Sequence, residues 1–179
     1  METRELPIVA GHLALDFANT VDDPEGPTRH DHLGTPAELV RWAERVGLRA
    51  GAAPLARVHE LRDVLNAVFG AVARNEPVPW ETFRPFAVDA LANADLSPEH
   101  TLTWPDDPMA LLWRVADAAT ELLTSPDVHR VKQCDGCPWV FLDHSKNGSR
   151  RWCAMDDCGK HAKIQRYVAR RAARRRVAP

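Results

Sequence analysis

The sequence predicts a mainly α-helical fold with a few short strands, in which a helical N-terminal domain precedes a small C-terminal module. Several stretches before residue 126 repeat apolar residues at intervals of three and four, the spacing of one helix face. All four cysteines lie between residues 134 and 158. Residues 1–128 hold 10 Lys and Arg against 21 Asp and Glu, whereas residues 129–179 hold 13 against 4. We therefore predict an acidic, mostly helical domain over residues 1–126 and a basic module over residues 127–179.

Length and composition limit the class of protein. A chain of 179 residues with 45% hydrophobic residues can form one medium domain, or a domain plus a small module. No run approaches 18 apolar residues, so we expect no membrane span. The start, METRELPIVAGH, lacks the basic and apolar regions of a secretory signal. We therefore expect a cytoplasmic protein, in which thiols stay reduced and disulfides are rare.

The N-terminal domain begins with the stretch GHLALDFANTVDD at residues 11–23. Its short apolar run does not separate helix from strand. A turn-rich loop over residues 22–34 leads to the string TPAE at residues 35–38, which has the pattern of a helix start. Thr is an N-cap residue, Pro suits the first helical position and Glu stands at the capping-box position. Gly47 or Gly51 can end this helix.

Three further helices are predicted before the boundary. Residues 54–74 repeat apolar side chains at three and four, while Arg62 and its charged neighbours fall outside that face. Residues 80–94 and 107–124 show the same spacing. Residues 100–104, HTLTW, can form a short strand.

The cysteine spacing predicts a metal site. Cys134 and Cys137 are separated by two residues, fifteen residues follow, and Cys153 and Cys158 are separated by four. Two close pairs at this separation are typical of a zinc ion held by four thiolates in a tetrahedron. Because all four ligands come from the protein, no position is left for catalysis. We therefore expect one structural Zn²⁺ ion as the cofactor.

Three other interpretations of the cysteines were weighed against the zinc site. Two disulfides would need an oxidising compartment. A redox-active pair at Cys134 and Cys137 would need a surrounding strand and long helix that the sequence does not show. Four unrelated core cysteines would have no reason to lie in pairs. The spacing favours the zinc site over all three.

The residues around the cysteines predict a treble-clef-like module. A strand at residues 140–142, a Lys-Asn-Gly-Ser turn and a returning strand at residues 150–152 would form a hairpin. Asp156 or Asp157 would then cap a helix whose first turn carries Cys158. A module this small has no self-sufficient core, so the metal decides whether it folds.

Residues 157–176 predict a strongly basic helix. Its apolar residues Ile164, Tyr167 and Val168 share one face, which we expect to pack back on Phe141 or Trp152. Cations on another face have the pattern of a nucleic-acid-binding helix. The predicted DNA-contacting side chains of this helix and of the preceding loop are Lys146, Arg150, Arg151, Lys160, Lys163, Arg166, Arg170 and Arg174. A solvated face, or a tail that pairs with the acidic domain, is the alternative.

Other polar residues have two interpretations each. Asp16, Asn19 and Thr20 could line a ligand pocket, or they could cap a helix and satisfy buried backbone groups. The string His-Asp-His at residues 30–32 could bind a metal, but a solvated turn is the expected structure. His161 could replace a cysteine as ligand, although four thiolates make a surface position the better prediction.

The C-terminal residues resemble the CGNR-type zinc finger. The resemblance rests on the four cysteines, on Phe141, Asp143 and Ser145, and on the strings RRWC at residues 150–153 and CG at residues 158–159. The string LALDFANT at residues 13–20 resembles the LDFxNT signature of the ABATE domain. That domain precedes this finger in bacterial proteins assigned to transcription regulation under stress. The two resemblances together cover nearly the whole chain in the expected order.

The resemblance implies zinc bound by the four cysteines, DNA binding by the C-terminal module, and a mainly helical N-terminal domain that senses a small-molecule effector. One position departs from the family pattern. The name-giving tetrapeptide reads Cys158-Gly159-Lys160-His161, with Lys and His where the family usually has Asn and Arg. Metal binding is unaffected because the cysteine is kept, whereas any DNA contact or packing made by the Asn–Arg pair is put in doubt.

We therefore expect a non-enzymatic transcription regulator whose zinc-stabilised module binds DNA. Two alternatives stay open. In the first, the basic helix docks on an acidic protein surface. In the second, the protein is an enzyme with its active site near Asp16 and Asn19. The sequence contains neither a glycine-rich phosphate loop nor a nucleophile elbow, which disfavours the enzyme.

Overall fold

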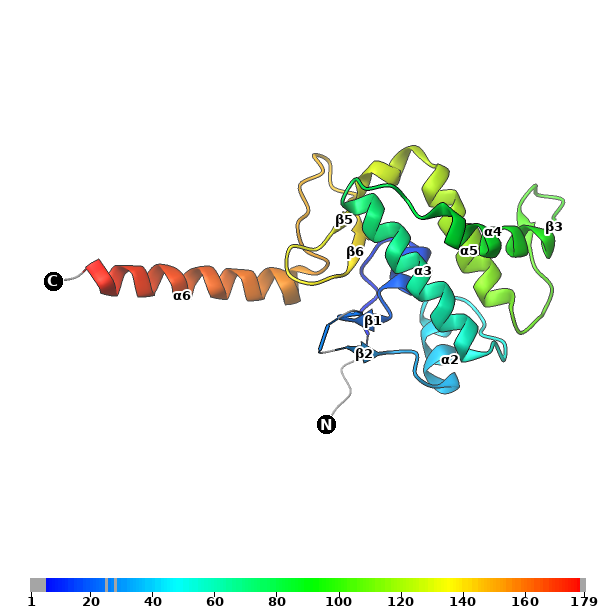
Figure 1. Cartoon of the computed structure of the whole chain (residues 1–179), viewed down its shortest axis with the longest axis horizontal. Coiled ribbons are helices and arrows are strands. Elements are labelled where there is room, and N and C mark those ends of the chain that lie inside the picture. The colour runs from blue at the N-terminus through cyan, green and yellow to red at the C-terminus, as the bar shows by residue number, and fades with distance from the viewer. Residues whose placement is uncertain (1–5, 25, 28, 178–179) are drawn as a thin grey trace.

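Over the residues that the structure describes, the fold consists of five helices and three short antiparallel ribbons, followed by one projecting helix (Figure 1). The computed structural model describes residues 6–24, 26–27 and 29–177, with side chains as far as residue 172. The helices of the body are α1 Leu13–Ala18, α2 Pro36–Arg45, α3 Leu55–Ala73, α4 Trp80–Ala92 and α5 Ala110–Thr124. The prediction of a mainly α fold with few short strands is confirmed.

The ribbons each contain two strands of two or three residues. They pair β1 Val21–Asp22 with β2 His30–Asp31, β3 Asp95–Leu96 with β4 Leu102–Thr103, and β5 Val131–Gln133 with β6 Val140–Leu142. A short 3₁₀ helix, η1 Pro126–Arg130, joins α5 to β5. A π-helical turn, η2 Met155–Gly159, leads into the last helix, α6 Lys160–Val177. None of the helices among the described residues has the length and apolar character needed to cross a membrane.

The start and end of α2 follow the sequence prediction. The hydroxyl of Thr35 accepts a hydrogen bond from the backbone N–H of Glu38 at 3.3 Å and donates one to its carboxylate at 2.9 Å. The first bond is the N-cap half of a capping box, whereas the second joins the two side chains and leaves the backbone N–H of Thr35 out of the pattern. At the other end, Gly47 has a φ of +75°, a conformation that glycine adopts without strain. The stretch 11–23, left undecided above, forms α1 and then β1.

One core joins the helical body to the C-terminal hairpin. Apolar side chains of α1, α3, α4 and α5 are buried together, among them Phe17, Leu65, Phe69 and Val115. Val131 of β5 and the three residues of β6 belong to the same buried cluster. The predicted boundary at residue 126 lies at the start of η1, yet the packing on its two sides is continuous. The hairpin that carries the first two cysteines is therefore part of the body core.

Arg62 was expected outside the apolar face of α3, and that expectation was wrong. Its side chain is 0% exposed, and its Nη1 donates to Asp31 Oδ1 of β2 at 2.6 Å. Its Nε donates to Asp63 at 3.3 Å. A buried charge needs such partners, because desolvation is expensive when it is uncompensated. The ion pair fixes the β1–β2 ribbon against α3.

Residues on both sides of α1 hold β6 in place. The side-chain amide of Asn19 makes two hydrogen bonds with the backbone of Val140 in β6. Its Nδ2 donates to the Val140 carbonyl at 2.8 Å, and its Oδ1 accepts the Val140 N–H at 3.0 Å. The N–H of Leu142 donates to the Ala10 carbonyl at 2.8 Å. These bonds occupy the edge of β6 that β5 does not cover, so no backbone group of this buried strand needs solvent.

We predict that Asn19→Ala lowers the free energy of unfolding by about 2 to 3 kcal/mol, because the buried N–H and C=O of Val140 both lose their partner. Chemical denaturation of the zinc-loaded protein measures the change. The matched control is Asn93→Ala, which removes an exposed amide at the end of α4. The control should change the value by no more than about 0.5 kcal/mol. Equal effects of the two substitutions would contradict the role given to Asn19.

Candidate metal centre

The four cysteines converge on one point. Their sulfur atoms all lie within 4.8 Å of one another. The Sγ–Sγ distance is 3.6 Å between Cys137 and Cys153, and 3.7 Å between Cys153 and Cys158. A tetrahedral zinc ion with Zn–S bonds of about 2.3 Å requires sulfur atoms roughly 3.8 Å apart. The cysteines are free rather than joined in disulfides, so the two-disulfide interpretation is wrong.

The first two ligands lie in the turn of the β5–β6 hairpin. Strand β5 ends at Gln133, Cys134 and Cys137 follow, and β6 begins at Val140. The N–H of Cys134 donates to the Trp139 carbonyl at 2.9 Å, which closes the turn. The Sγ of Cys134 accepts the N–H of Gly136 at 3.4 Å. This hydrogen bond holds the Cys134 sulfur within the turn.

Gly136 has a steric role in this turn. A Cβ atom built on Gly136 would lie 3.2 Å from Cys158 Cβ and 3.4 Å from its sulfur. A side chain at this position would therefore crowd the fourth ligand, which would have to shift by a few tenths of an ångström. The close approach of the turn to the start of α6 requires glycine here.

The second pair of ligands comes from a loop and from the turn before α6. The predicted hairpin between residues 140–142 and 150–152 is wrong, because β6 pairs with β5 and residues 150–152 form no strand. Two hydrogen bonds join the loop to the turn of the first ligand pair. The N–H of Asp135 donates to the Arg151 carbonyl at 3.0 Å, and the N–H of Cys153 donates to Cys134 Sγ at 3.2 Å. The expected aspartate cap is also replaced, since Ala154 is the N-cap of η2 and no side chain caps this turn.

The protonation of the thiols favours a dication among them. Hydrogen bonding to Cys153, together with burial, raises the pKa of Cys137. Burial and the nearby Cys153 raise the pKa of Cys158 to about 12. The hydrogen bond with Cys137 lowers the pKa of Cys153 to about 6. Four sulfurs this close cannot all be thiolates unless a positive ion compensates their charge. The donor set therefore fits Zn²⁺.

Asp143 organises the loop between the two ligand pairs. Its buried carboxylate accepts hydrogen bonds from the N–H groups of Ser145 at 2.9 Å and Arg150 at 3.1 Å. Lys132 of β5 places its ammonium 2.7 Å from the same carboxylate. Burial by itself would raise the pKa of Asp143, but these donors outweigh it and hold the pKa well below its ordinary value. In the sequence, Asp143 stands out only as part of the resemblance to the CGNR-type zinc finger.

Arg150, predicted as a DNA contact, is used inside the protein. Its guanidinium lies 4.3 Å from the centre of the Phe141 ring. Its Nη2 donates to the carbonyl of Val9 at 2.7 Å and to the carbonyl of Cys153. Arg150 therefore ties the second ligand pair to the N-terminal segment. Arg151 is exposed and forms an ion pair with Asp135 at 2.5 Å, and Lys146 is exposed on the loop.

The predicted pocket residues are occupied by internal hydrogen bonds. Asp16 Oδ1 accepts the N–H groups of Val9 and Ala10, each at 2.9 Å. Burial raises the pKa of Asp16. Thr20 donates its hydroxyl to the Phe17 carbonyl at 2.7 Å, and Asn19 holds β6 as described above. All three side chains are buried, so the geometry favours the second interpretation given above, satisfaction of buried backbone groups.

The histidines lie outside the metal site. His32 contacts Asp22 at 2.9 Å, and Asp31 is taken by Arg62. His161 is exposed, with its Nδ1 3.5 Å from Asp157 Oδ1. The four cysteines are the one group among the described residues with the spacing of a metal site built from three or more His, Cys, Asp or Glu.

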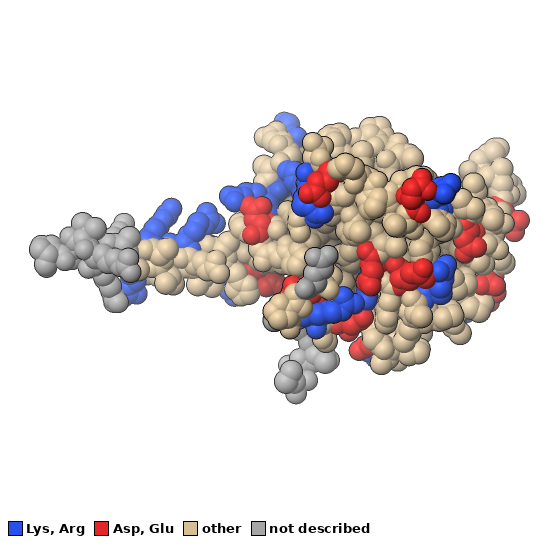
Figure 2. Space-filling model, viewed as in Figure 1, with Lys and Arg blue, Asp and Glu red and all other residues tan. Residues whose placement is uncertain are grey.

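Helix α6 projects away from the body (Figure 1). Ile164, Tyr167 and Val168, which were expected to pack on Phe141 or Trp152, are instead 49%, 63% and 58% exposed. That expectation was wrong, because α6 leaves η2 in a direction that brings no other described element of the chain against this face. The cations Lys160, Lys163, Arg166 and Arg170 are all exposed. Blue side chains mark the projecting helix in Figure 2, and the side chain of Arg174 lies outside the described part.

Two family models match the chain. The ABATE model, described as "Putative stress-induced transcription regulator", matches residues 11–126. The CGNR zinc finger model matches residues 130–171. A search of curated proteins finds no match. The four clustered cysteines lie within the second match, and they are the ligand set of one structural zinc ion.

We predict one zinc ion per chain, measured by elemental analysis of the purified protein. Cys153→Ser should lower the zinc content to near zero and reduce the unfolding temperature of the whole chain. The effect extends to the body because the β5–β6 hairpin is part of the body core. Ser149→Ala, in the exposed loop of the same module, is the control and should keep full metal content. A Cys153→Ser protein with one bound zinc would contradict the assignment.

Proposed function

We propose, from the premise that this chain belongs to the ABATE family and carries a CGNR zinc finger, that it is a non-enzymatic transcription regulator that binds DNA through helix α6 and the adjoining zinc loop. The observation that carries the proposal is the bare, basic surface of a projecting helix whose base is fixed by a zinc ligand. Cys158 lies in η2, directly before α6, so the metal would set the direction of the helix.

The dimensions and charge of α6 suit the major groove of DNA. A helix with its side chains is about 10–12 Å wide, and the major groove is about 12 Å wide. Residues 160–177 contain eight Lys and Arg and no Asp or Glu. Phosphate contacts from such a helix supply affinity that does not depend on base sequence. The acidic body would be repelled by the same phosphates, which favours an approach with the zinc module first.

The arrangement of the module supports a treble-clef-like description. A ligand-bearing turn comes first, a loop follows, and a helix leaves from the last ligand. The proposal places the protein in the cytoplasm, where reduced thiols remain available to the metal.

We predict that Arg166→Gln combined with Arg170→Gln weakens binding to duplex DNA at least about 10-fold in low salt. The logarithmic dependence of affinity on salt should become less steep by about 2, because each lost phosphate contact removes about 0.9 from the slope. Fluorescence anisotropy at several salt concentrations measures both quantities.

The control for this experiment is Arg41→Gln combined with Arg84→Gln. Both arginines are exposed on the body and face a glutamate one helical turn away. The control has the same net charge as the test variant but keeps α6 intact, so its DNA affinity should stay within about 2-fold of the parent. Equal losses in the two variants, or no DNA binding by the parent at low salt, would contradict the proposal.

A second candidate function, docking on an acidic protein surface, is favoured by the apolar stripe on α6. Ile164, Tyr167 and Val168 lie at intervals of three and four and are well exposed. The chain itself offers a complementary surface on α4 and β3, where exposed apolar residues stand beside acids. That surface includes Val88, Leu91 and Leu96 together with Glu81 and Asp95. A second copy of the chain is therefore the partner we propose to test.

Sedimentation equilibrium of the zinc-loaded protein tests this second function. If α6 docks on α4 of a second copy, the parent should self-associate, and Ile164→Gln combined with Val168→Gln should sediment as a monomer. Val88→Gln combined with Leu91→Gln should give the same result. A mixture of the two variants should form a dimer, because each keeps the surface that the other lacks. A monomeric parent at concentrations of about 100 μM would exclude self-association.

A further inference from the structure

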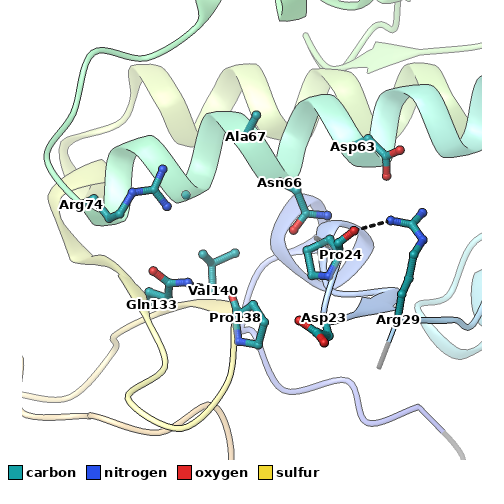
Figure 3. A pocket seen from close by; sticks show the side chains of 11 residues that line it. Asp23, Pro24, Arg29, Asp63, Asn66, Ala67, Arg74, Gln133, Pro138 and Val140 are labelled. Atoms are coloured by element: carbon teal, nitrogen blue, oxygen red, sulfur yellow. Dashed lines mark hydrogen bonds between the residues drawn. The ribbon is translucent and has the colours of Figure 1, made fainter. Parts of the chain in front are cut away.

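A cavity between α3 and the zinc-bearing hairpin carries the inference (Figure 3). Its volume is about 580 Å³, within the usual range of about 300–1,000 Å³ for small-molecule sites. One wall is a face of α3, and the remaining lining comes from the β5–β6 hairpin and from the connection between β1 and β2, which contributes Asp23, Pro24 and Arg29. Gln133 directly precedes that ligand pair, Pro138 directly follows it, and both line the cavity. The site therefore touches the metal centre through neighbouring residues.

Small residues on α3 create the space. Asp63, Asn66, Ala67, Gly70 and Arg74 line the cavity at the spacing of one helix face. Gly70 lies inside a 19-residue helix, where glycine is less favourable than alanine by about 1 kcal/mol. A Cβ atom at Gly70 would lie 3.0 Å from Nη1 of Arg74. The glycine therefore lets the Arg74 guanidinium lie back along the helix, over the floor of the cavity.

The charges on this wall are separated. Because the guanidinium of Arg74 lies at the level of Gly70, it stands about 6 Å along the helix from Asn66 and about 10 Å from Asp63, at 1.5 Å per residue. Figure 3 shows Arg74 and Gln133 at one end of the cavity, Asp63 and Arg29 at the other, and Asn66 between them. The guanidinium of Arg29 donates to the Pro24 carbonyl at 2.7 Å. The wall thus offers a cation at one end and a carboxylate at the other.

The polar groups on this wall retain capacity for a ligand. The Nε of Arg74 donates to Glu76 at 2.8 Å, an exposed ion pair of small stabilising effect, and its terminal nitrogens face Gly70. The Nδ2 of Asn66 donates to the Ala18 carbonyl at 2.8 Å, which fixes the amide so that its oxygen is left as an acceptor. Asp63 accepts from Arg62 at 3.3 Å and is 54% exposed. One strong donor and two acceptors are therefore arranged along one line.

We propose that this cavity binds a zwitterionic metabolite of amino-acid to dipeptide size. The carboxylate of the ligand pairs with Arg74, whose planar guanidinium suits bidentate recognition. The ammonium group lies between Asn66 Oδ1 and the Asp63 carboxylate. The inference deepens the regulator proposed above, since it names the effector class and places the effector against the zinc turn. Ligand binding itself does not require DNA.

Isothermal titration calorimetry of the zinc-loaded full chain tests the inference. The probes are the individual L-amino acids and a set of dipeptides, each compared with its N-acetyl and C-amide derivative. At least one zwitterion should bind with a Kd below about 10 mM, and each derivative should bind at least about 10-fold more weakly. Two outcomes would overturn the inference: no zwitterion binds in this range, or acetate binds as tightly as the best zwitterion.

Two variants and one control complete the test. Arg74→Gln should weaken binding at least about 10-fold because it removes the charge that pairs with the carboxylate. Ala67→Leu should abolish binding by filling the cavity, and leucine is readily accommodated in a helix. The control is Arg84→Gln, since Arg84 is also an exposed arginine paired with a glutamate at 2.8 Å. A loss with Arg84→Gln equal to that with Arg74→Gln would overturn the site.

DNA binding is measured separately on the same proteins. Loss of ligand binding with DNA binding intact would overturn this inference and leave the proposed regulator standing. Ligand binding without DNA binding would overturn the proposed regulator and leave the ligand site standing. The two proposals therefore fail independently.

Discussion

The hairpin of β5 and β6 belongs both to the core of the helical body and to the metal site, and the rest of the structure depends on this double role. Its buried side chains complete the core of the helical body, while its turn supplies half of the metal site. One edge of β6 pairs with β5, and the other edge is taken by Asn19 and Ala10. A buried strand with an open edge would leave backbone groups without hydrogen bonds. Ala10 and Asn19 therefore have to lie along the free edge of β6, and this contact holds the hairpin whose turn carries Cys134 and Cys137.

The ABATE signature and the zinc finger form one structural unit through these contacts. Asp16 orients the segment before α1 by accepting the N–H groups of Val9 and Ala10. The carbonyls of those same residues then accept hydrogen bonds from Arg150 and Leu142 of the finger. A charged acceptor, two backbone amides and an arginine thus form a continuous chain of bonds across the predicted boundary. Asp16 and Asn19, which the sequence suggested as pocket residues, instead hold the N-terminal domain and the zinc finger together through hydrogen bonds.

Local signals in the sequence predicted the metal ligands and the start of α2, whereas features that depend on distant contacts were missed. Cysteine spacing and capping residues act within a few positions, so they can be read from the chain. The burial of Arg62 depends on Asp31, 31 residues away. The pairing of β5 with β6 depends on a three-residue strand that is too short to recognise. Helical spacing correctly grouped Ile164 with Val168, but periodicity cannot say whether another element covers that face.

The metal site separates a fixed part of the module, strand β6, from a part that is free to change direction, helix α6. Strand β6 is fixed on both edges and in the core, so it offers little freedom to move. Helix α6 is joined to the body through η2, whose Cys158 converges with the other three sulfurs, and α6 projects freely beyond it. We therefore propose that a signal from the body would reach α6 through the turn at Cys134 and Cys137. The cavity beside α3 touches that turn on both sides of the ligand pair, at Gln133 and Pro138. In the proposed regulator, a ligand in this cavity would contact residues on both sides of the first ligand pair, and this is the route by which we propose that it acts on α6.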